Sequence, residues 1–213
     1  GIVTNAHKIN EGKEVKLDNS FGDFLYIERE NAQMALNATI GLIKTKLPAY
    51  VGANEMDIQV LTPMRNGILG VNSLNPGLQM YMNPPDKNKN EKEIAGVVFR
   101  EGDKVMQIKN NYSLEWHRIG GDGENKGVGV FNGDMGYIET IDEERKVLSV
   151  VFDDERRIVY DNLYVEELEL AYAITIHKSQ GSEFKVVVMP TFMGSAFLMN
   201  RNILYTGITR AKE

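Results

Sequence analysis

The sequence has no cysteine among its 213 residues, only three histidines and no long apolar run. The absence of cysteine excludes disulfides and thiolate metal sites, and it fits a reducing, cytoplasmic setting. The histidines are scattered, whereas zinc ligands usually come at short paired spacings. No apolar run reaches the roughly 18 residues that a bilayer crossing needs. We therefore expect a soluble, cytoplasmic protein with no metal site of its own and no membrane partner.

Basic residues are also in the minority, because 24 Lys and Arg stand against 30 Asp and Glu, for a net charge of −6. This balance argues against a broad basic face that clamps nucleic acid. The excess of acidic residues is largest in residues 97–165, whereas residues 171–213 carry five basic and two acidic residues. A protein that moves along a strand needs only a few phosphate contacts, so the composition leaves nucleic acid open as a partner.

Hydrophobic periodicity divides the chain into three segments. Residues 1–95 and 166–213 alternate apolar strands with helical patterns, whereas residues 96–165 show short alternating runs separated by turns, which is typical of a small β-barrel. We expect helices at 2–9, 31–47, 70–82 and 200–210, and strands at 24–27, 58–61, 168–176 and 184–190. Residues 86–93 read as a polar surface linker, and the glycine-rich residues 120–129 as a mobile loop. The pattern predicts an α/β domain with an inserted barrel.

A polar cluster directly follows the apolar strand at 168–176. Nearly uniformly apolar strands are buried in parallel sheets, where ligands gather at the carboxyl ends of the strands. Hydroxyl, imidazole and amide groups, together with free backbone N–H groups, can hold phosphate oxygens there. The cluster consists of Thr175, His177, Lys178, Ser179, Gln180, Gly181, Ser182 and Glu183. On composition alone, a turn that simply caps the next helix is the alternative.

The order of these residues, AYAITIHKSQGSEF, resembles motif V of superfamily 1 DNA helicases of the RecD/TraA branch, where T-x-H-K-x-Q-G precedes an acidic residue. The resemblance implies that Thr175 and His177 lie against the DNA backbone, with Lys178 and Ser179 beside them. It also implies that Gln180 and Gly181 couple the DNA track to the nucleotide cleft, and that Glu183 approaches the nucleotide.

Residues 200–212, NRNILYTGITRAK, resemble motif VI of the same family, with Tyr205, Thr206, Thr209 and Arg210 in register. The resemblance makes Arg210 the candidate catalytic residue. An arginine delivered by one motor domain can stabilise the charge on a γ-phosphate held by its neighbour. An ordinary surface arginine that complements the dipole of a helix is the alternative.

Two further segments resemble parts of the RecD-like motor. VLTPMRNGILGVNSLN, at 60–75, makes Thr62, Arg65 and Asn75 candidates for strand contact, although Thr-Pro and Asn-Gly turns are common in any α/β protein. FREGDKVMQIKN and VFNGDMGYI resemble the SH3-like barrel called domain 2B. The barrel adds candidate DNA contacts at Lys104, Lys109, Asn110, Asn111 and Tyr112, whereas Trp116 is suited equally to packing and to stacking on a base.

The sequence has no G-x-x-x-x-G-K-[ST] loop and no acidic Mg²⁺ motif in the required context. The resemblance implies a second RecA-like motor domain, 2A, formed by 1–95 and 166–213, with the SH3-like barrel inserted at 96–165. ATP and Mg²⁺ would be bound mainly by a first RecA-like domain expected before Gly1, so we expect this chain to be inactive alone, as a piece of a longer protein or as an encoded truncated form.

The expected function is that of the carboxy-terminal portion of an ATP-dependent DNA helicase. By resemblance, the parent moves 5′ to 3′ on single-stranded DNA and unwinds duplex in recombination or repair, with nuclease or other recombination subunits as candidate partners. A non-catalytic nucleic-acid- or protein-binding module with a degenerate motor fold is the rival, and it accounts for the acidity and the missing phosphate loop. An RNA helicase is a third reading, because backbone contacts alone do not distinguish DNA from RNA.

Overall fold

The structure, a computed structural model, describes residues 1–213 except for residues 16, 121–124, 192–199 and 213. The chain forms two compact units, one from residues 1–82 with 173–213 and one from residues 83–172. The sequence-based limits at 96 and 165 both lie inside the second unit, and the assignment of these segments to domains 2A and 2B remains a proposal. Within the described ranges, no helix combines the length and apolar character of a membrane crossing.

The first unit is built on a parallel three-stranded sheet in the order β11-β1-β12. Its strands are β1 (Ile58–Thr62), β11 (Ala173–Thr175) and β12 (Val186–Val188). Every residue of β1 is buried, which explains why the strand reads as a continuous apolar run broken only by Gln59. Thr62 and Thr175 are partners in the parallel register, so β1 and β11 end at the same edge of the sheet.

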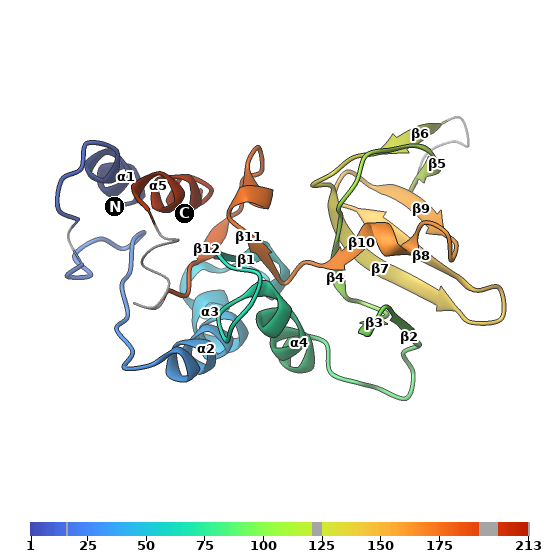
Figure 1. Ribbon diagram of the computed structural model, residues 1–213, viewed down its shortest axis with the longest axis horizontal. Helices are drawn as coiled ribbons and strands as arrows, with labels where there is room; N and C mark the ends of the chain where they lie inside the picture. Colours follow the sequence, from blue (N-terminus) through green and yellow to red (C-terminus); the bar gives the residue numbers. More distant parts are fainter. Residues whose placement is uncertain (16, 121–124, 192–199, 213) are drawn as a thin grey trace. The chain divides into compact units, whose positions relative to one another are not determined.

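Helices cover both faces of this sheet (Figure 1). On one face lie α2 (Ala32–Gly41), a π-helical turn (Leu42–Lys46), α3 (Leu47–Val51) and α4 (Val71–Met82); on the other lie α1 (Ile2–Asn10) and α5 (Arg201–Ile208). Ala6 and Ile9 of α1 form a buried cluster with Ile208 of α5. The four predicted helices are all present. The helix predicted at 31–47 continues beyond its predicted end, because Pro48 lies in the first turn of α3, where proline is tolerated. This helical segment ends at Gly52, which has a φ of 60°.

The strand expected at residues 24–27 does not form. The backbone N–H of Tyr26 donates to Asn19 Oδ1 at 2.6 Å, and Asn19 Nδ2 donates to the Tyr26 carbonyl at 2.9 Å. An asparagine side chain therefore occupies the hydrogen-bonding positions that a neighbouring strand would use. The strand predicted from the apolar pattern at 24–27 was therefore wrong.

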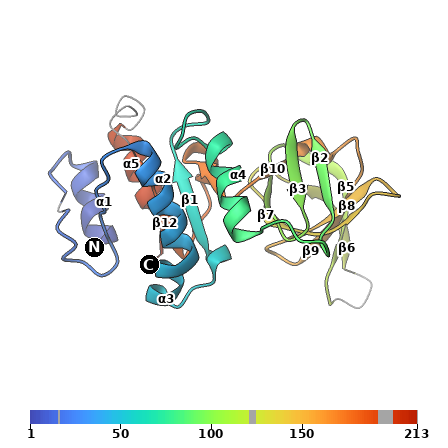
Figure 2. The same cartoon turned by 90° about the horizontal axis from the view of Figure 1, so that it is seen from below.

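The second unit is an antiparallel sheet in the order β10-β4-β7-β8-β9-β5-β6, with a separate hairpin (Figure 2). The sheet strands are β4 (Lys104–Gln107), β5 (Asn111–Arg118), β6 (Lys126–Val130), β7 (Met135–Asp142), β8 (Val147–Phe152), β9 (Arg156–Tyr160) and β10 (Leu168–Leu170); the hairpin strands are β2 (Glu91–Ile94) and β3 (Val97–Arg100). The expected small SH3-like β-unit is present, but among the described residues β6 and β10 are not paired, so the sheet is open.

Two expectations about segment limits were wrong. The polar linker at 86–93 ends early, because β2 begins at Glu91 and pairs with β3. The single strand expected at 168–176 is divided: β10 pairs with β4 in the second unit, and β11 pairs with β1 in the first. A run of apolar residues does not reveal where a strand leaves one sheet and enters another. Part of the expected mobile loop, 121–124, lies outside the described residues.

Candidate functional site

The loop after β11 combines buried hydroxyls with exposed polar side chains. The Ser179 hydroxyl, which is fully buried, donates to the Ile176 carbonyl at 2.6 Å, and the buried Thr175 hydroxyl accepts the Lys178 backbone N–H at 3.4 Å. These bonds fold residues 177–179 into a short 3-10 turn. His177 and Gln180 are exposed beyond it. The loop therefore presents an imidazole and an amide to solvent, while its hydroxyls hold it in shape.

Gly181 completes this loop in a conformation that favours glycine. Its φ is 86°, and no other atom lies within 4 Å of the position that a Cβ would take. A substitution there would thus strain the backbone without causing a clash.

The loop between β1 and α4 lies at the same edge of the sheet. The Thr62 side chain is fully buried, and its hydroxyl donates to the Leu69 carbonyl at 2.6 Å. The Thr62 carbonyl in turn accepts the backbone N–H of Ile176 at 3.0 Å. Arg65 is exposed in the middle of the loop. Thr62 thus ties the two loops together, and Arg65 is the basic side chain that this loop presents to solvent.

Asn75 is engaged within the protein. Its Nδ2 donates to the Ala173 carbonyl at 3.0 Å, and its Oδ1 accepts the Ala173 backbone N–H at 2.7 Å. The side chain is buried in α4, with 9% of the residue exposed. The sequence predicted DNA contacts for Asn75, Thr62, Thr175 and Ser179. In the structure each of these four side chains is hydrogen-bonded within the protein. DNA contact by them remains a prediction, and the internal hydrogen bonds do not favour it.

Arg210 lies where α5 meets the loop after β11. Its guanidinium donates to the Ser182 carbonyl at 3.1 Å, to the Thr206 carbonyl at 3.2 Å and to the Thr209 hydroxyl at 3.2 Å. All three acceptors are neutral. A phosphate oxygen is a stronger acceptor for arginine than a neutral carbonyl, because charge-assisted hydrogen bonds are roughly twice as strong. Among the described residues, the guanidinium is therefore held in place by neutral acceptors.

The backbone joins the two candidate motifs as well. Phe184 N–H donates to the Arg210 carbonyl at 2.8 Å, and Lys212 N–H donates to the Phe184 carbonyl at 2.9 Å, which forms a parallel bridge between Phe184 and Ala211. Glu183 pairs with Lys212 at 3.2 Å, but both side chains are more than half exposed, so the ion pair stabilises little. Lys212 is a partner of the site that the sequence did not single out, although it is the last residue of the segment 200–212 that resembles motif VI.

The structure separates the candidate DNA contacts of the β-unit into two groups. Lys104 and Asn111 are buried, and Asn111 donates to Glu167 at 3.0 Å. Lys109, Asn110 and Tyr112 are exposed. Trp116 packs inside the unit, because it lies over Gly127, and the Arg156 guanidinium sits 6.0 Å from its ring centre. Trp116 is half-buried and has packing contacts within the unit, whereas its stacking on a base stays a prediction.

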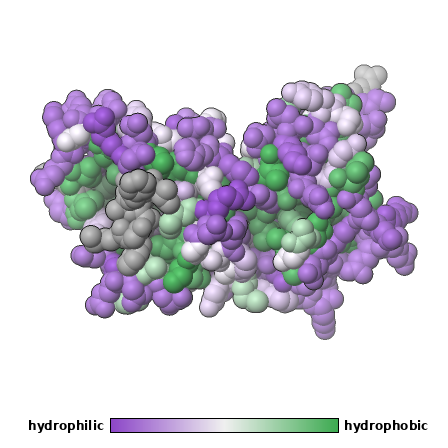
Figure 3. Space-filling view, viewed as in Figure 1, coloured by the Kyte–Doolittle hydropathy of each residue, from purple (hydrophilic) through white to green (hydrophobic). Residues whose placement is uncertain are grey.

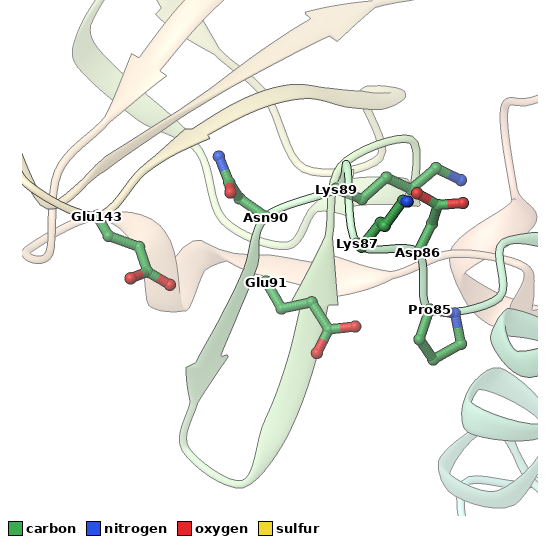
Figure 4. A pocket seen from close by; sticks show the side chains of 7 residues that line it. All are labelled: Pro85, Asp86, Lys87, Lys89, Asn90, Glu91 and Glu143. Atoms are coloured by element: carbon green, nitrogen blue, oxygen red, sulfur yellow. The ribbon is translucent and has the colours of Figure 1, made fainter.

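Two hollows lie away from the predicted residues. In the first unit, a groove of about 810 Å³ runs between residues 22–30, helices α2 and α3, and the edge of β12. Its lining is largely apolar, and hydrophobic side chains reach the surface of this unit in Figure 3. In the second unit, a polar hollow of about 470 Å³ is lined by Pro85, Asp86, Lys87, Lys89, Asn90, Glu91 and Glu143 (Figure 4).

Neither hollow offers an obvious reactive group. In the polar hollow, Glu91 is already paired with Arg100 at 2.6 Å. Across the described part of the chain, no group of three or more His, Asp or Glu side chains is placed to hold a metal ion. The two loops at the edge of the sheet and Arg210 carry groups with the chemistry to bind phosphate.

The chain is similar to known helicases both in family models and in curated relatives. Residues 74–152 match the model of the ATP-dependent RecD-like DNA helicase SH3 domain, and residues 170–213 match the UvrD-like helicase C-terminal domain. The chain is 35% identical over 156 residues to the ATP-dependent RecD2 DNA helicase of Deinococcus radiodurans, and 32% identical over 166 residues to the RecBCD enzyme subunit RecD of Buchnera aphidicola. Each alignment covers 73% of this chain.

The solved structure of Pif1 helicase from Bacteroides in complex with ADP-AlF3 and single-stranded DNA shares the fold, with a TM-score of 0.50 at 16% identity; the match covers all of this chain and 47% of that one. The chain spans about a fifth of the curated relatives, 19% of the Deinococcus protein and 23% of the Buchnera protein. With an α/β unit of the superfamily 1 helicase type, an SH3 unit of the RecD-like type and a helicase C-terminal segment, the chain belongs to the RecD-like family of superfamily 1 helicases.

Proposed function

We propose that this chain is the carboxy-terminal motor portion of an ATP-dependent DNA helicase that moves 5′ to 3′ along single-stranded DNA. The observation that carries the proposal is the junction of the loop after β11 with α5, where Arg210 bonds to the Ser182 carbonyl and Phe184 pairs with Ala211. A residue suited to phosphate and a loop suited to a strand are thereby joined into one structural element. This is the arrangement that coupling of hydrolysis to movement requires.

In this proposal the exposed and half-buried side chains contact the strand, and the fully buried ones position them. Arg65, His177, Lys178 and Gln180 would contact the DNA backbone, whereas Thr62, Thr175 and Ser179 shape the loops. Arg210 would exchange its neutral acceptors for the γ-phosphate when ATP closes a first motor domain onto this one. Gly181 and Glu183 would lie on the nucleotide side of the same loop.

ATP would bring the hydrolysable phosphate, and Mg²⁺ would neutralise charge on its oxygens. The described residues of this chain include no cluster that could hold the metal, so in the parent the metal and most of the nucleotide would be bound by the first RecA-like domain. Recombination subunits such as a nuclease are proposed as partners because one relative is named a subunit of the RecBCD enzyme.

The test is to measure ATP hydrolysis and unwinding by the full-length parent on duplexes with 5′ or 3′ single-stranded tails. We expect unwinding of the 5′-tailed duplex, and we expect Arg210→Ala to reduce hydrolysis by about 10³-fold or more with little change in DNA affinity, because the arginine acts on the transition state. Hydrolysis at the wild-type rate in this variant would contradict the role of Arg210.

The rival reading, a non-catalytic binding module, is favoured by the net charge of −6. It predicts no DNA-stimulated hydrolysis in the wild-type parent under any condition. Tailed RNA duplexes provide the remaining comparison: if they were unwound and DNA was not, the substrate would be RNA.

A further inference from the structure

Asn75 is the side chain through which α4 holds β11 in place. β11 is the end strand of the three-stranded sheet and pairs with β1 on one side. Its other side faces α4, where the Asn75 amide both accepts from and donates to the backbone of Ala173. An amide side chain has the same donor and acceptor as a peptide group, so Asn75 takes the place of a residue in a neighbouring strand. The bonds are buried, where unpaired backbone groups are strongly disfavoured.

Ala173, the residue that Asn75 holds, lies close to the loop after β11. Ala173 is the first residue of β11 and lies two residues before Thr175, where the exposed loop of His177 and Gln180 begins. Asn75 lies in the first half of α4, the helix that follows the loop containing Arg65. The two bonds therefore fix the helix after one candidate strand-binding loop to the strand that precedes the other.

We propose that Asn75 is a positioning residue that holds the two strand-binding loops in a fixed relation, rather than a residue that touches the strand itself. The proposal rests on the function proposed above for these loops. It assigns Asn75 a task that it performs equally with and without DNA, because its amide stays bonded to Ala173. When the loop after β11 moves, α4 and Arg65 would then move with it.

The contact can be followed directly through amide hydrogen exchange at Ala173 in this chain, measured with and without single-stranded DNA. We expect the Ala173 N–H to be protected in both conditions. If Asn75 turned to the DNA, it would release Ala173, and protection of this amide would fall when DNA is added. Such a fall would overturn the proposal, and the measurement requires no ATP hydrolysis.

Variants separate a positioning role from general stability. Asn75→Leu keeps a side chain of similar size but removes both bonds, and we expect exchange at Ala173 to become about tenfold faster or more, as for the loss of one buried hydrogen bond. Asn75→Asp retains the acceptor for the Ala173 N–H, so we expect this amide to stay protected. In the full-length parent we expect Asn75→Leu to lower DNA-stimulated ATP hydrolysis by about 10–100-fold, in line with the effect of a misplacement of about 1 Å.

The chain offers a control in Asn19, which makes the same two bonds to the backbone of Tyr26 in an exposed position outside the candidate site; its φ is 55°, so leucine there also strains the backbone. Asn19→Leu should speed exchange at Tyr26 and leave DNA-stimulated hydrolysis unchanged. Equal losses in Asn19→Leu and Asn75→Leu would overturn the positioning role. If the wild-type parent shows no DNA-stimulated hydrolysis, the proposed function fails, whereas the exchange result at Ala173 still decides how Asn75 is bonded.

Discussion

Among single residues, Gly70 shows how tightly the loop before α4 is closed. A Cβ at Gly70 would lie 2.4 Å from the Asn66 carbonyl oxygen and 2.6 Å from the carbonyl carbon and oxygen of Arg65. These are backbone atoms, which cannot turn aside as a flexible side chain can. The loop also depends on backbone bonds from Val71 to Met64 at 3.1 Å and from Asn72 to Arg65 at 3.0 Å. The place of Arg65 in the candidate site thus depends on the absence of a side chain at Gly70.

Gly70→Ala should therefore destabilise the first unit by about 1–3 kcal/mol, the range for overpacking at a closed site. Gly77 is the matched control, because it lies within α4 and nothing outside its chain neighbours and the backbone of its own helix lies within 4 Å of its Cβ position. Gly77→Ala should instead stabilise the chain by about 0.5–1 kcal/mol, since alanine loses less backbone entropy than glycine in a helix. Thermal unfolding of both variants measures the difference, and similar melting temperatures would contradict this account of the loop.

Single residues also show how much of the candidate site could be predicted from the sequence. The sequence located the two loops and Arg210, because the type and order of residues at the end of a buried strand carry that signal. It could not tell which polar side chains point inward. Thr62 and Ser179 have the residue types of phosphate contacts, yet both hydroxyls bond to backbone carbonyls in their own loops. The direction of a side chain at a strand end depends on the turn that follows, and the turn forms only in the folded chain.

Among elements, the junction between β10 and β11 shows where sequence patterns fail. Residues 168–176 read as one apolar strand, but the two halves pair in different sheets. Tyr172 lies between them and is 2% exposed. Its hydroxyl donates to Asp103 Oδ1 at 2.8 Å, and Asn83 donates to the same oxygen at 2.7 Å. The presence of the helices, by contrast, could be predicted because their periodicity is local, although Pro48 was wrongly taken as the end of the second one.

Burial raises the pKa of Tyr172, and the neighbouring Asp103 carboxylate raises it further. The phenol therefore stays protonated and remains a donor across the pH range in which proteins are ordinarily folded. Asp103 is fully buried and also accepts the Arg100 backbone N–H at 2.6 Å. Asn83 and Tyr172 are the first and last residues of the second unit, so Asp103 joins the two ends of this unit.

Tyr172→Phe should accordingly destabilise the second unit by about 1–3 kcal/mol, because a buried carboxylate loses one of its donors. Tyr112→Phe is the control, since Tyr112 is 71% exposed, and substitutions at such positions usually change stability by less than about 0.5 kcal/mol. Unfolding in urea, followed by amide exchange in β4 and β7, measures both. Equal stability of the two variants would show that Asp103 does not need the phenol.

For the whole molecule, the distribution of charge shows that the acidic residues lie mainly outside the unit that contains the candidate strand-binding site. The second unit, residues 83–172, contains 12 basic and 20 acidic residues, whereas the first unit contains 12 basic and 10 acidic residues. The acidity that argues against nucleic-acid binding thus belongs mainly to the unit that does not contain the candidate site. The net charge of the whole chain therefore does not reveal that basic residues slightly outnumber acidic ones in the first unit.

This distribution predicts a shallow salt dependence. If Arg65, His177 and Lys178 provide the phosphate contacts, only one to three counterions are released when this chain binds single-stranded DNA, and the slope of log K against log salt should lie between about −0.7 and −2. Lys178→Ala should reduce the slope by about 0.7, because one contact is lost. Fluorescence titrations with an oligothymidine at several salt concentrations measure it.

Lys87→Ala provides the control, because Lys87 is an exposed lysine of the second unit and lines only the polar hollow. It should leave the slope unchanged. A slope steeper than about −4, or an equal change in both variants, would mean that many lysines and arginines of both units contact the strand. The strand would then be held by a broad electrostatic surface, and the two loops at the end of β1 and β11 would lose their special role. A shallow slope that depends on Lys178 instead fits a motor that must release its strand at every step, because each additional phosphate contact slows that release.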